Sequence, residues 1–252
     1  MRPGHPHGVV RTLFEAPLDD LAAALEASVV AAPRRWRAAA LLLGSVVLTW
    51  WVYVPVHELL HALGCALAGG TVHELQIAPE YGAALLARLF PFVVAGGPYA
   101  GRLSGFDTHG SDLAYLATDA LPFALTVVVG VPLLLHCRRG PHPLRCGAAI
   151  VLAAAPFYSV TGDYYEMGSI IVTRLAGSVS GSGVDAFVPL RGDDAVQLVG
   201  RVWTDASALA PGLSRGAALA VVVASLVTGT LLAFATHAAG RVVARAMGVE
   251  PS

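Results

Sequence analysis

The chain has 252 residues, of which 56% are hydrophobic and 13% are charged, and its mean hydropathy is +0.65. Ordinary soluble domains carry about a quarter charged residues, so this composition excludes a water-soluble globule. The net charge of -1 and the lack of any Lys/Arg tract exclude a nucleic-acid-binding protein. The three cysteines are odd in number and do not indicate a secreted disulfide framework. We therefore expect an all-α polytopic membrane protein embedded in the lipid bilayer.

The chain begins with a predicted cytoplasmic or interfacial segment, residues 1–37. Apolar residues recur at helical spacing within 18–30, which predicts a helix lying on the bilayer or against the membrane core. The first span is expected from residue 38 to about 68. This stretch exceeds the roughly 20 residues that a bilayer core requires, so we expect it to tilt, to kink at Pro55 or to protrude.

A short β element follows the first span. The piece 71–82 is more polar, and Val72, Leu75 and Ile77 predict a short strand or hairpin there. The segment 83–100 is apolar but contains an arginine, two prolines and a pair of glycines. Non-helical backbone at membrane depth survives only when it is buried in protein or lines a cavity. We therefore expect a re-entrant or partly inserted element, not a full span.

Three further spans are predicted, which gives about four transmembrane helices in all. They cover roughly residues 113–137, 146–172 and 217–236. This pattern divides the chain into a membrane core, residues 38–176, an extramembrane loop, residues 177–216, and a C-terminal transmembrane helix with its tail, residues 217–252.

Arginine clusters indicate how these spans are oriented. With four spans, three clusters fall on one side of the membrane: residues 34–37, residues 138–145 and residues 241–245. The positive-inside rule then places both termini in the cytoplasm, and we expect a multi-pass protein of the cell's inner membrane. The face to which a functional site opens stays undecided.

The first predicted span contains the pattern His57-Glu58-Leu59-Leu60-His61, or HExxH. Residues four apart on a helix face nearly the same way, so both imidazoles can bind one zinc ion. Glu58 beside them can take a proton from a water that the metal activates. Three ionisable groups in an apolar helix are costly and indicate function. We therefore predict His57 and His61 as zinc ligands and Glu58 as the catalytic base; the alternative is a buried polar cluster bonded to neighbouring helices.

A catalytic zinc ion usually takes three protein ligands. We expect Asp163 to be the third, because it lies about as deep in its predicted span as His57 does, where a lone carboxylate is costly. Glu166, one turn further along, is the alternative ligand. Either acid can instead mark the end of a helix at the membrane interface.

These residues resemble those of the site-2 protease family of intramembrane zinc metalloproteases. The similar stretch runs from His57 through Gly69 and Gly70 to Ile77, followed by a Gly-Pro pair at 97–98 and by Gly162-Asp163. The resemblance implies that His57, His61 and Asp163 are zinc ligands and that Glu58 is the base. The chain departs from the family pattern because Gly162 precedes the aspartate, Gly101 stands where the family often has asparagine, and no asparagine occurs anywhere.

The function that follows is a zinc metalloendopeptidase that cleaves a membrane protein in or near a transmembrane segment. The substrate segment must unwind, and Val72 and Ile77 on the predicted strand are expected to bind it by edge pairing. The longest hydrophilic connection is too short for the PDZ module that some relatives carry. Two alternatives remain: a zinc-binding scaffold or regulator without turnover, and a small transporter of protons or metal.

Overall fold

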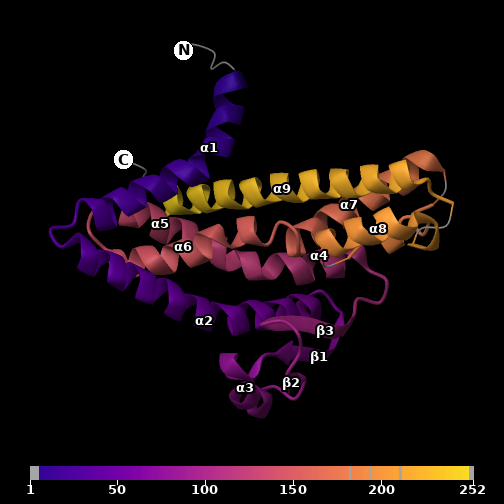
Figure 1. Cartoon of the computed structure of the whole chain (residues 1–252), viewed down its shortest axis with the longest axis horizontal. Coiled ribbons are helices and arrows are strands. Elements are labelled where there is room, and N and C mark those ends of the chain that lie inside the picture. The colour runs from indigo at the N-terminus through magenta and orange to yellow at the C-terminus, as the bar shows by residue number, and fades with distance from the viewer. Residues whose placement is uncertain (1–5, 182, 193, 210–211, 250–252) are drawn as a thin grey trace. The chain divides into compact units, whose positions relative to one another are not determined.

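The computed structural model describes residues 6–181, 183–192, 194–209 and 212–249. The ends of the predicted N-terminal segment and C-terminal tail, and four residues of the predicted loop 177–216, lie outside this range. The chain divides into two compact units, Met1–Ala155 with Phe234–Ser252 and Pro156–Ala233. Figure 1 labels the helices and strands of the chain.

Within the described residues, 4 helical stretches are long and apolar enough to cross a membrane. They are Arg35–Leu67, Asp112–Cys137, Pro143–Ser180 and Arg215–Ala246. This confirms the prediction of a mainly helical chain with four long apolar stretches. Their boundaries lie within a few residues of the predicted ones, except that the third and fourth extend further toward the C-terminus.

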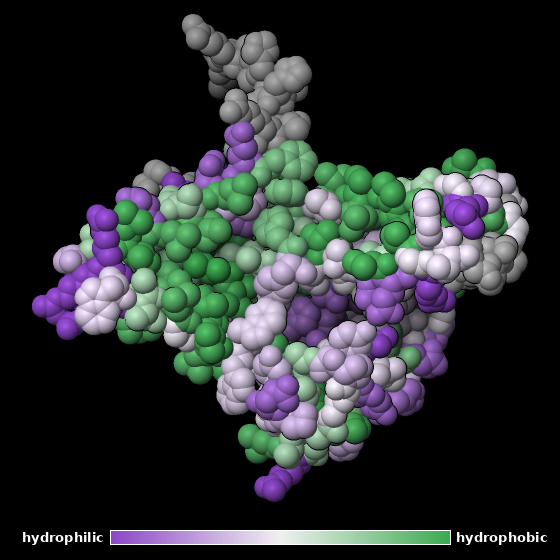
Figure 2. Space-filling model, viewed as in Figure 1, coloured by the Kyte–Doolittle hydropathy of each residue, from purple (hydrophilic) through white to green (hydrophobic). Residues whose placement is uncertain are grey.

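The first of these stretches is a single helix, α2, which covers Arg35–Leu67. Proline has no backbone N–H, so Pro55 omits one hydrogen bond inside α2, yet the helix continues through it. A nearly continuous hydrophobic surface covers the N-terminal half of α2 (Figure 2). The helix ends where Gly69 adopts a φ of 88°, the left-handed conformation that commonly follows a helix.

The strand or hairpin predicted at 71–82 is confirmed as a strand, which belongs to a three-stranded mixed sheet. Strand β1 (Thr71–Ile77) is central, in the order β2-β1-β3. Strand β2 (Val93–Ala95) pairs parallel to it, and β3 (Gly101–Asp107) pairs antiparallel. A short helix, α3 (Ala83–Leu89), connects β1 to β2. The segment 83–100 thus contains a short helix and a strand of the sheet, and its placement as a re-entrant or partly inserted element stays a prediction.

The second long stretch is irregular. Helix α4 (Asp112–Ala120) begins where the Ser111 hydroxyl accepts a hydrogen bond from the Ala114 N–H. A 3-10 turn, a π-helical turn and α5 (Val131–Cys137) follow. At Gly130, a Cβ atom would lie 2.7 Å from the backbone nitrogen of Ala153. This close approach positions the stretch against α6 (Pro143–Tyr158).

The N-terminal helix α1 (Pro6–Leu25) continues into a π-helical turn at Glu26–Val30. The helix predicted at 18–30 is therefore present and begins earlier. Its buried residues Ala16, Asp20 and Ala24 are spaced four apart and form one face. That face packs in a core with α5, α6 and the C-terminal part of α9 (Arg215–Ala246).

The third predicted span, 146–172, is not one helix. Helix α6 ends at Tyr158, and α7 (Asp163–Ser180) begins after a turn whose Gly162 has φ -105° and ψ -114°. The Ser159 hydroxyl donates to the Asp163 carboxylate at 2.6 Å across this turn. A carboxylate in the first turn of a helix is favoured by the helix dipole. Asp163 therefore stands at a helix start and not in the middle of a continuous span.

The second unit contains a helix that the sequence did not indicate. The predicted loop 177–216 includes α8 (Ala195–Leu209), which packs against α7 and the first half of α9 in a core of Tyr165, Leu198, Val202 and Val222. Gly168 and Gly229 let α7 and α9 approach closely; a Cβ at Gly168 would lie 2.8 Å from the Gly229 nitrogen. Small residues permit such close crossings of apolar helices.

Candidate metal centre

The HExxH residues lie on α2 and come together as the pattern predicts. His57 and His61 are buried, and their Nε2 atoms are 3.0 Å apart. One ligand atom from each of His57, Glu58 and His61 lies within 4.8 Å of the other two. These three residues form the one group of potential metal ligands found among the described residues.

Each histidine is oriented through its other ring nitrogen. The Nδ1 atom of His61 lies 2.9 Å from the carbonyl oxygen of Thr118. A carbonyl only accepts, so Nδ1 donates this bond, and Nε2 is the nitrogen that can accept a hydrogen bond or bind a metal ion. The Nδ1 atom of His57 lies 2.7 Å from the Tyr53 hydroxyl. Metal-binding histidines almost always have such partners, which fix the ring orientation.

This donor set fits a divalent ion. Two imidazole nitrogens bound to one tetrahedral zinc at about 2.0–2.1 Å lie about 3.3 Å apart, close to the observed separation of 3.0 Å. His57 can donate from Nε2 to His61 when no ion is bound. To bind a cation through Nε2, His57 would carry its proton on Nδ1 instead and donate it to the Tyr53 hydroxyl oxygen. Imidazole nitrogens with a carboxylate suit zinc, among other transition metals.

Neighbouring elements hold these rings in place. Phe123 packs edge-on against His57, with 5.5 Å between ring centroids. Helix α4 reaches His61 because Gly64 has no side chain; a Cβ there would lie 2.5 Å from the carbonyl oxygen of Ala117. The Thr118 carbonyl thereby comes within hydrogen-bonding distance of the imidazole. The site is therefore assembled by the contact of α2 with α4.

The sheet packs against the same part of α2. Leu59 contacts the sheet core of Leu75, Ile77 and Val93. The Trp51 indole donates to the Glu80 carbonyl at 2.6 Å, just after β1. On β1, hydrogen bonds from Gln76 and Ser104 lower the pKa of the half-buried Glu74 carboxyl.

Gly101, the first residue of β3, lies directly against Glu58. A Cβ at this position would overlap the Glu58 Cγ and would lie 3.0 Å from its carboxyl carbon. The missing side chain therefore lets the strand approach the predicted catalytic base.

The group of potential metal ligands found among the described residues does not include the two predicted third ligands, Asp163 and Glu166. Asp163 is half-buried, Glu166 is 7% exposed, and both belong to the second unit. Their role as third ligand stays a prediction.

Val72 and Ile77 lie on β1, as expected, but β1 is the central strand of the sheet. Ile77 is paired with both neighbouring strands and is fully buried. Edge pairing at Ile77 is therefore corrected, while a substrate-binding role for the two residues stays a prediction.

Sequence reasoning missed the residues that support the histidines. Tyr53 precedes His57 by four residues on one helix, and this spacing was a usable signal. The Thr118 contact is made by a backbone carbonyl, which every residue type has, so the sequence does not indicate it. Gly64 and Gly101 act by lacking a side chain, and only the packing of α4 and β3 reveals this.

We expect Tyr53→Phe to weaken metal binding about tenfold, since loss of such a supporting hydrogen bond typically costs 10–100-fold. The variant keeps the ring that packs beside His57, so folding should be unaffected. Competition with a chelator of known affinity measures the change. Tyr81→Phe is a matched control, because Tyr81 contacts Trp50 and neither histidine. Equal metal affinity in all three proteins would contradict the role of Tyr53.

Comparison of the chain with protein-family models, with curated proteins and with solved structures gave no match. The fold and the metal-binding group therefore define the class of protein only as a mainly helical chain whose described residues include four long apolar helical stretches, with a candidate metal centre on the first of them.

Proposed function

We propose that this protein is an intramembrane zinc metalloendopeptidase that hydrolyses a peptide bond in or near a transmembrane segment of another membrane protein. The observation that carries the proposal is the convergence of the His57 and His61 Nε2 atoms beside Glu58, on a 33-residue apolar helix. The resemblance of the same residues to site-2 proteases supports it. On this proposal the four apolar stretches cross the cell's inner membrane, and Asp163 or Glu166 completes the ligand set.

The residues of the chain divide the chemistry between them. A bound zinc ion supplies a Lewis acid for the scissile carbonyl and lowers the pKa of a water molecule. Glu58 removes a proton from that water and later delivers it to the amine nitrogen that leaves. The contact of Glu58 with Gly101 restricts where the carboxylate can lie. Tyr53 and the Thr118 carbonyl keep both imidazoles turned toward each other.

A helical substrate must become extended before it is cut, because its carbonyls are engaged in the helix. Strand β3 suits this task. It is an outer strand of the sheet, and it begins at Gly101, against Glu58. An outer strand has backbone groups on one side that can pair with an added chain. We therefore propose that the substrate pairs with the edge of β3 and not with the central strand β1.

Metal removal tests this function. The full chain, purified in mild detergent, is expected to hold about one zinc ion and to cleave members of a panel of transmembrane peptides. Treatment with a strong chelator should abolish cleavage, and added zinc, but not magnesium, should restore it. If the zinc-loaded protein cleaves no peptide, the proposal is wrong and a scaffold or regulator without turnover is favoured. Proton or metal flux in proteoliposomes without hydrolysis would favour a transporter.

A further inference from the structure

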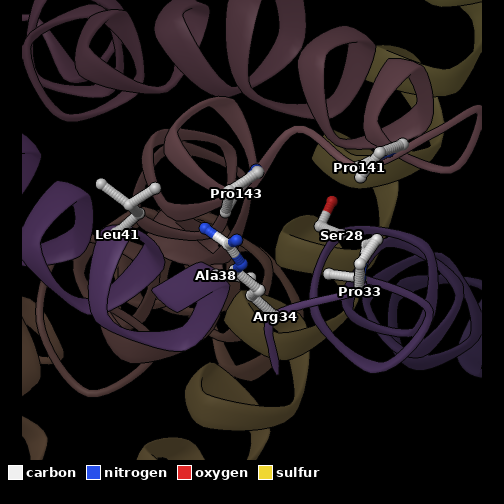
Figure 3. A pocket seen from close by; sticks show the side chains of 8 residues that line it. Ser28, Pro33, Arg34, Ala38, Leu41, Pro141 and Pro143 are labelled. Carbon is white, nitrogen blue, oxygen red and sulfur yellow. The ribbon is translucent and has the colours of Figure 1, made fainter. Parts of the chain in front are cut away.

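A second candidate site lies in the first unit, away from the metal centre. A pocket of about 280 Å³ is found where the turn between α1 and α2 meets the start of α6 (Figure 3). Its lining is mostly apolar, with Ser28 and Arg34 as the polar residues. The apolar lining residues are Ala32, Pro33, Ala38, Leu41, Pro141 and Pro143. This volume lies just below the usual range for small-molecule pockets. The pocket can therefore hold one part of a larger ligand, and the rest of that ligand would lie outside the pocket.

The pocket carries positive charge. The guanidinium group of Arg34 is directed into it, toward Pro143 (Figure 3). Arg35 and Arg37 follow on the first turn of α2 and are exposed. Within the described residues, these three arginines form no ion pair with an acidic side chain. In the described part of the chain, the positive charge of Arg34 in the pocket, and of Arg35 and Arg37 next to it in the sequence, is therefore not paired with an acidic side chain.

The same end of α2 has the features of a membrane interface. Trp36 is 70% exposed, and the Arg37 guanidinium lies over its ring at 5.0 Å from the centroid. Tryptophan and arginine are enriched where apolar helices leave the bilayer. The hydrophilic surface at the α1–α2 turn borders the hydrophobic surface over α2 (Figure 2). A ligand in this pocket would span that border.

An exposed apolar face of α2 extends from the pocket and can contact the apolar part of such a ligand. Leu41 lines the pocket, and Leu48 is two turns further along the same face of α2. They are 47% and 63% exposed, respectively. Ser45, between them, donates to the Leu144 carbonyl at 2.6 Å, which positions the start of α6 beside this face. An acyl chain can therefore lie along α2 beside α6.

We infer that this pocket binds an anionic phospholipid, with Arg34 on the phosphate and the acyl chains along Leu41 and Leu48. Charge complementarity favours an anionic lipid over a zwitterionic one, because each arginine near a membrane surface contributes about 1 kcal/mol to binding of anionic lipid. The inference rests on the proposed membrane placement but not on peptide hydrolysis.

Lipid titration monitored by native mass spectrometry tests this site. The full chain in mild detergent is titrated with phosphatidylglycerol or with phosphatidylcholine of the same acyl chains. We expect wild type to bind phosphatidylglycerol about fivefold more tightly, which corresponds to about 1 kcal/mol. Arg34→Ala should reduce this preference to less than about twofold, whereas Arg34→Lys, which keeps the charge, should retain most of it.

Arg88→Ala is the matched control, because Arg88 is also exposed but lies on α3, in the sheet region. It should keep the full preference. Equal binding of both lipids by wild type, or an unchanged preference in Arg34→Ala, would overturn the inference. Displacement of the lipid by glycerol 1-phosphate at comparable concentration would also overturn it, since the site would then take a soluble phosphate. Cleavage measured in lipid-free detergent should be equal in all four proteins, so failure of the lipid site is distinguishable from failure of the proposed enzyme.

Discussion

Replacing Glu58 with glutamine is expected to lower peptide hydrolysis at least about 100-fold while the metal content stays unchanged. General-base catalysis contributes about 10²–10⁴-fold, and an amide cannot accept the proton of a water molecule. Glutamine has nearly the same shape, so it can keep the contact that Glu58 makes with Gly101. The two histidines and their partners, Tyr53 and Thr118, are untouched. The expected loss therefore concerns turnover and not the assembly of the site.

The measurement is the initial rate of transmembrane-peptide cleavage, with the metal content of the same samples determined in parallel. Glu80→Gln is the matched control, because Glu80 is exposed and follows β1, outside the metal-binding group. It should cleave at the wild-type rate. If Glu58→Gln retains metal and cleaves as fast as wild type, Glu58 is not the base. If it loses both metal and activity, Glu58 acts as a ligand instead.

The long helices and the metal-binding group were predictable because each depends on local spacing. Runs of apolar residues set the four stretches, and the i, i+4 spacing of His57 and His61 put both imidazoles on one face of α2. The helical part of 18–30 followed from the same rule. Such signals need no knowledge of what a segment packs against.

The features that the sequence did not predict are those that long-range packing decides. Strand β2 has only 3 residues, and it forms by pairing with β1. Helix α3 separates the two strands in the sequence, so no local pattern indicates this pairing. The break between α6 and α7 depends on the turn at Gly162. The number of apolar residues in 146–172 does not reveal such a turn. Helix α8 buries Leu198 and Val202 against distant residues, although its segment looked like a loop. Periodicity within a segment carries too little information to resolve such cases.

Replacing Asp20 with alanine is expected to destabilise the first unit by about 3 kcal/mol. Asp20 lies on the buried face of α1 and is 1% exposed. Its carboxylate accepts hydrogen bonds from Arg138 at 2.9 Å, from Arg241 at 3.0 Å and from His237 Nε2 at 3.1 Å. These donors come from the end of α5 and from α9, so one carboxylate joins three elements that are distant in the sequence.

The expected loss is large because the donors remain after the carboxylate is removed. Both arginine side chains are 17% exposed, and the His237 side chain is 3% exposed. Breaking a buried ion pair typically costs about 3–5 kcal/mol, since the remaining charge is left without its partner. The partial exposure of the arginines allows some hydration, which favours the lower end of that range. Asp20→Asn keeps the shape but not the charge and should fall between wild type and Asp20→Ala.

Thermal unfolding in detergent measures this effect. A loss of 1 kcal/mol shifts the melting temperature by roughly 2–4 °C in a domain of this size, so Asp20→Ala should melt at least about 6 °C below wild type. Asp19→Ala is the matched control, because Asp19 is the preceding residue and is exposed; surface substitutions usually change stability by less than about 0.5 kcal/mol. Equal melting temperatures for the two alanine variants would show that the carboxylate does not hold α1 in place. A selective loss in Asp20→Ala would instead mean that α1 is an integral part of this unit, since a helix attached only through apolar contacts would not depend on one buried charge.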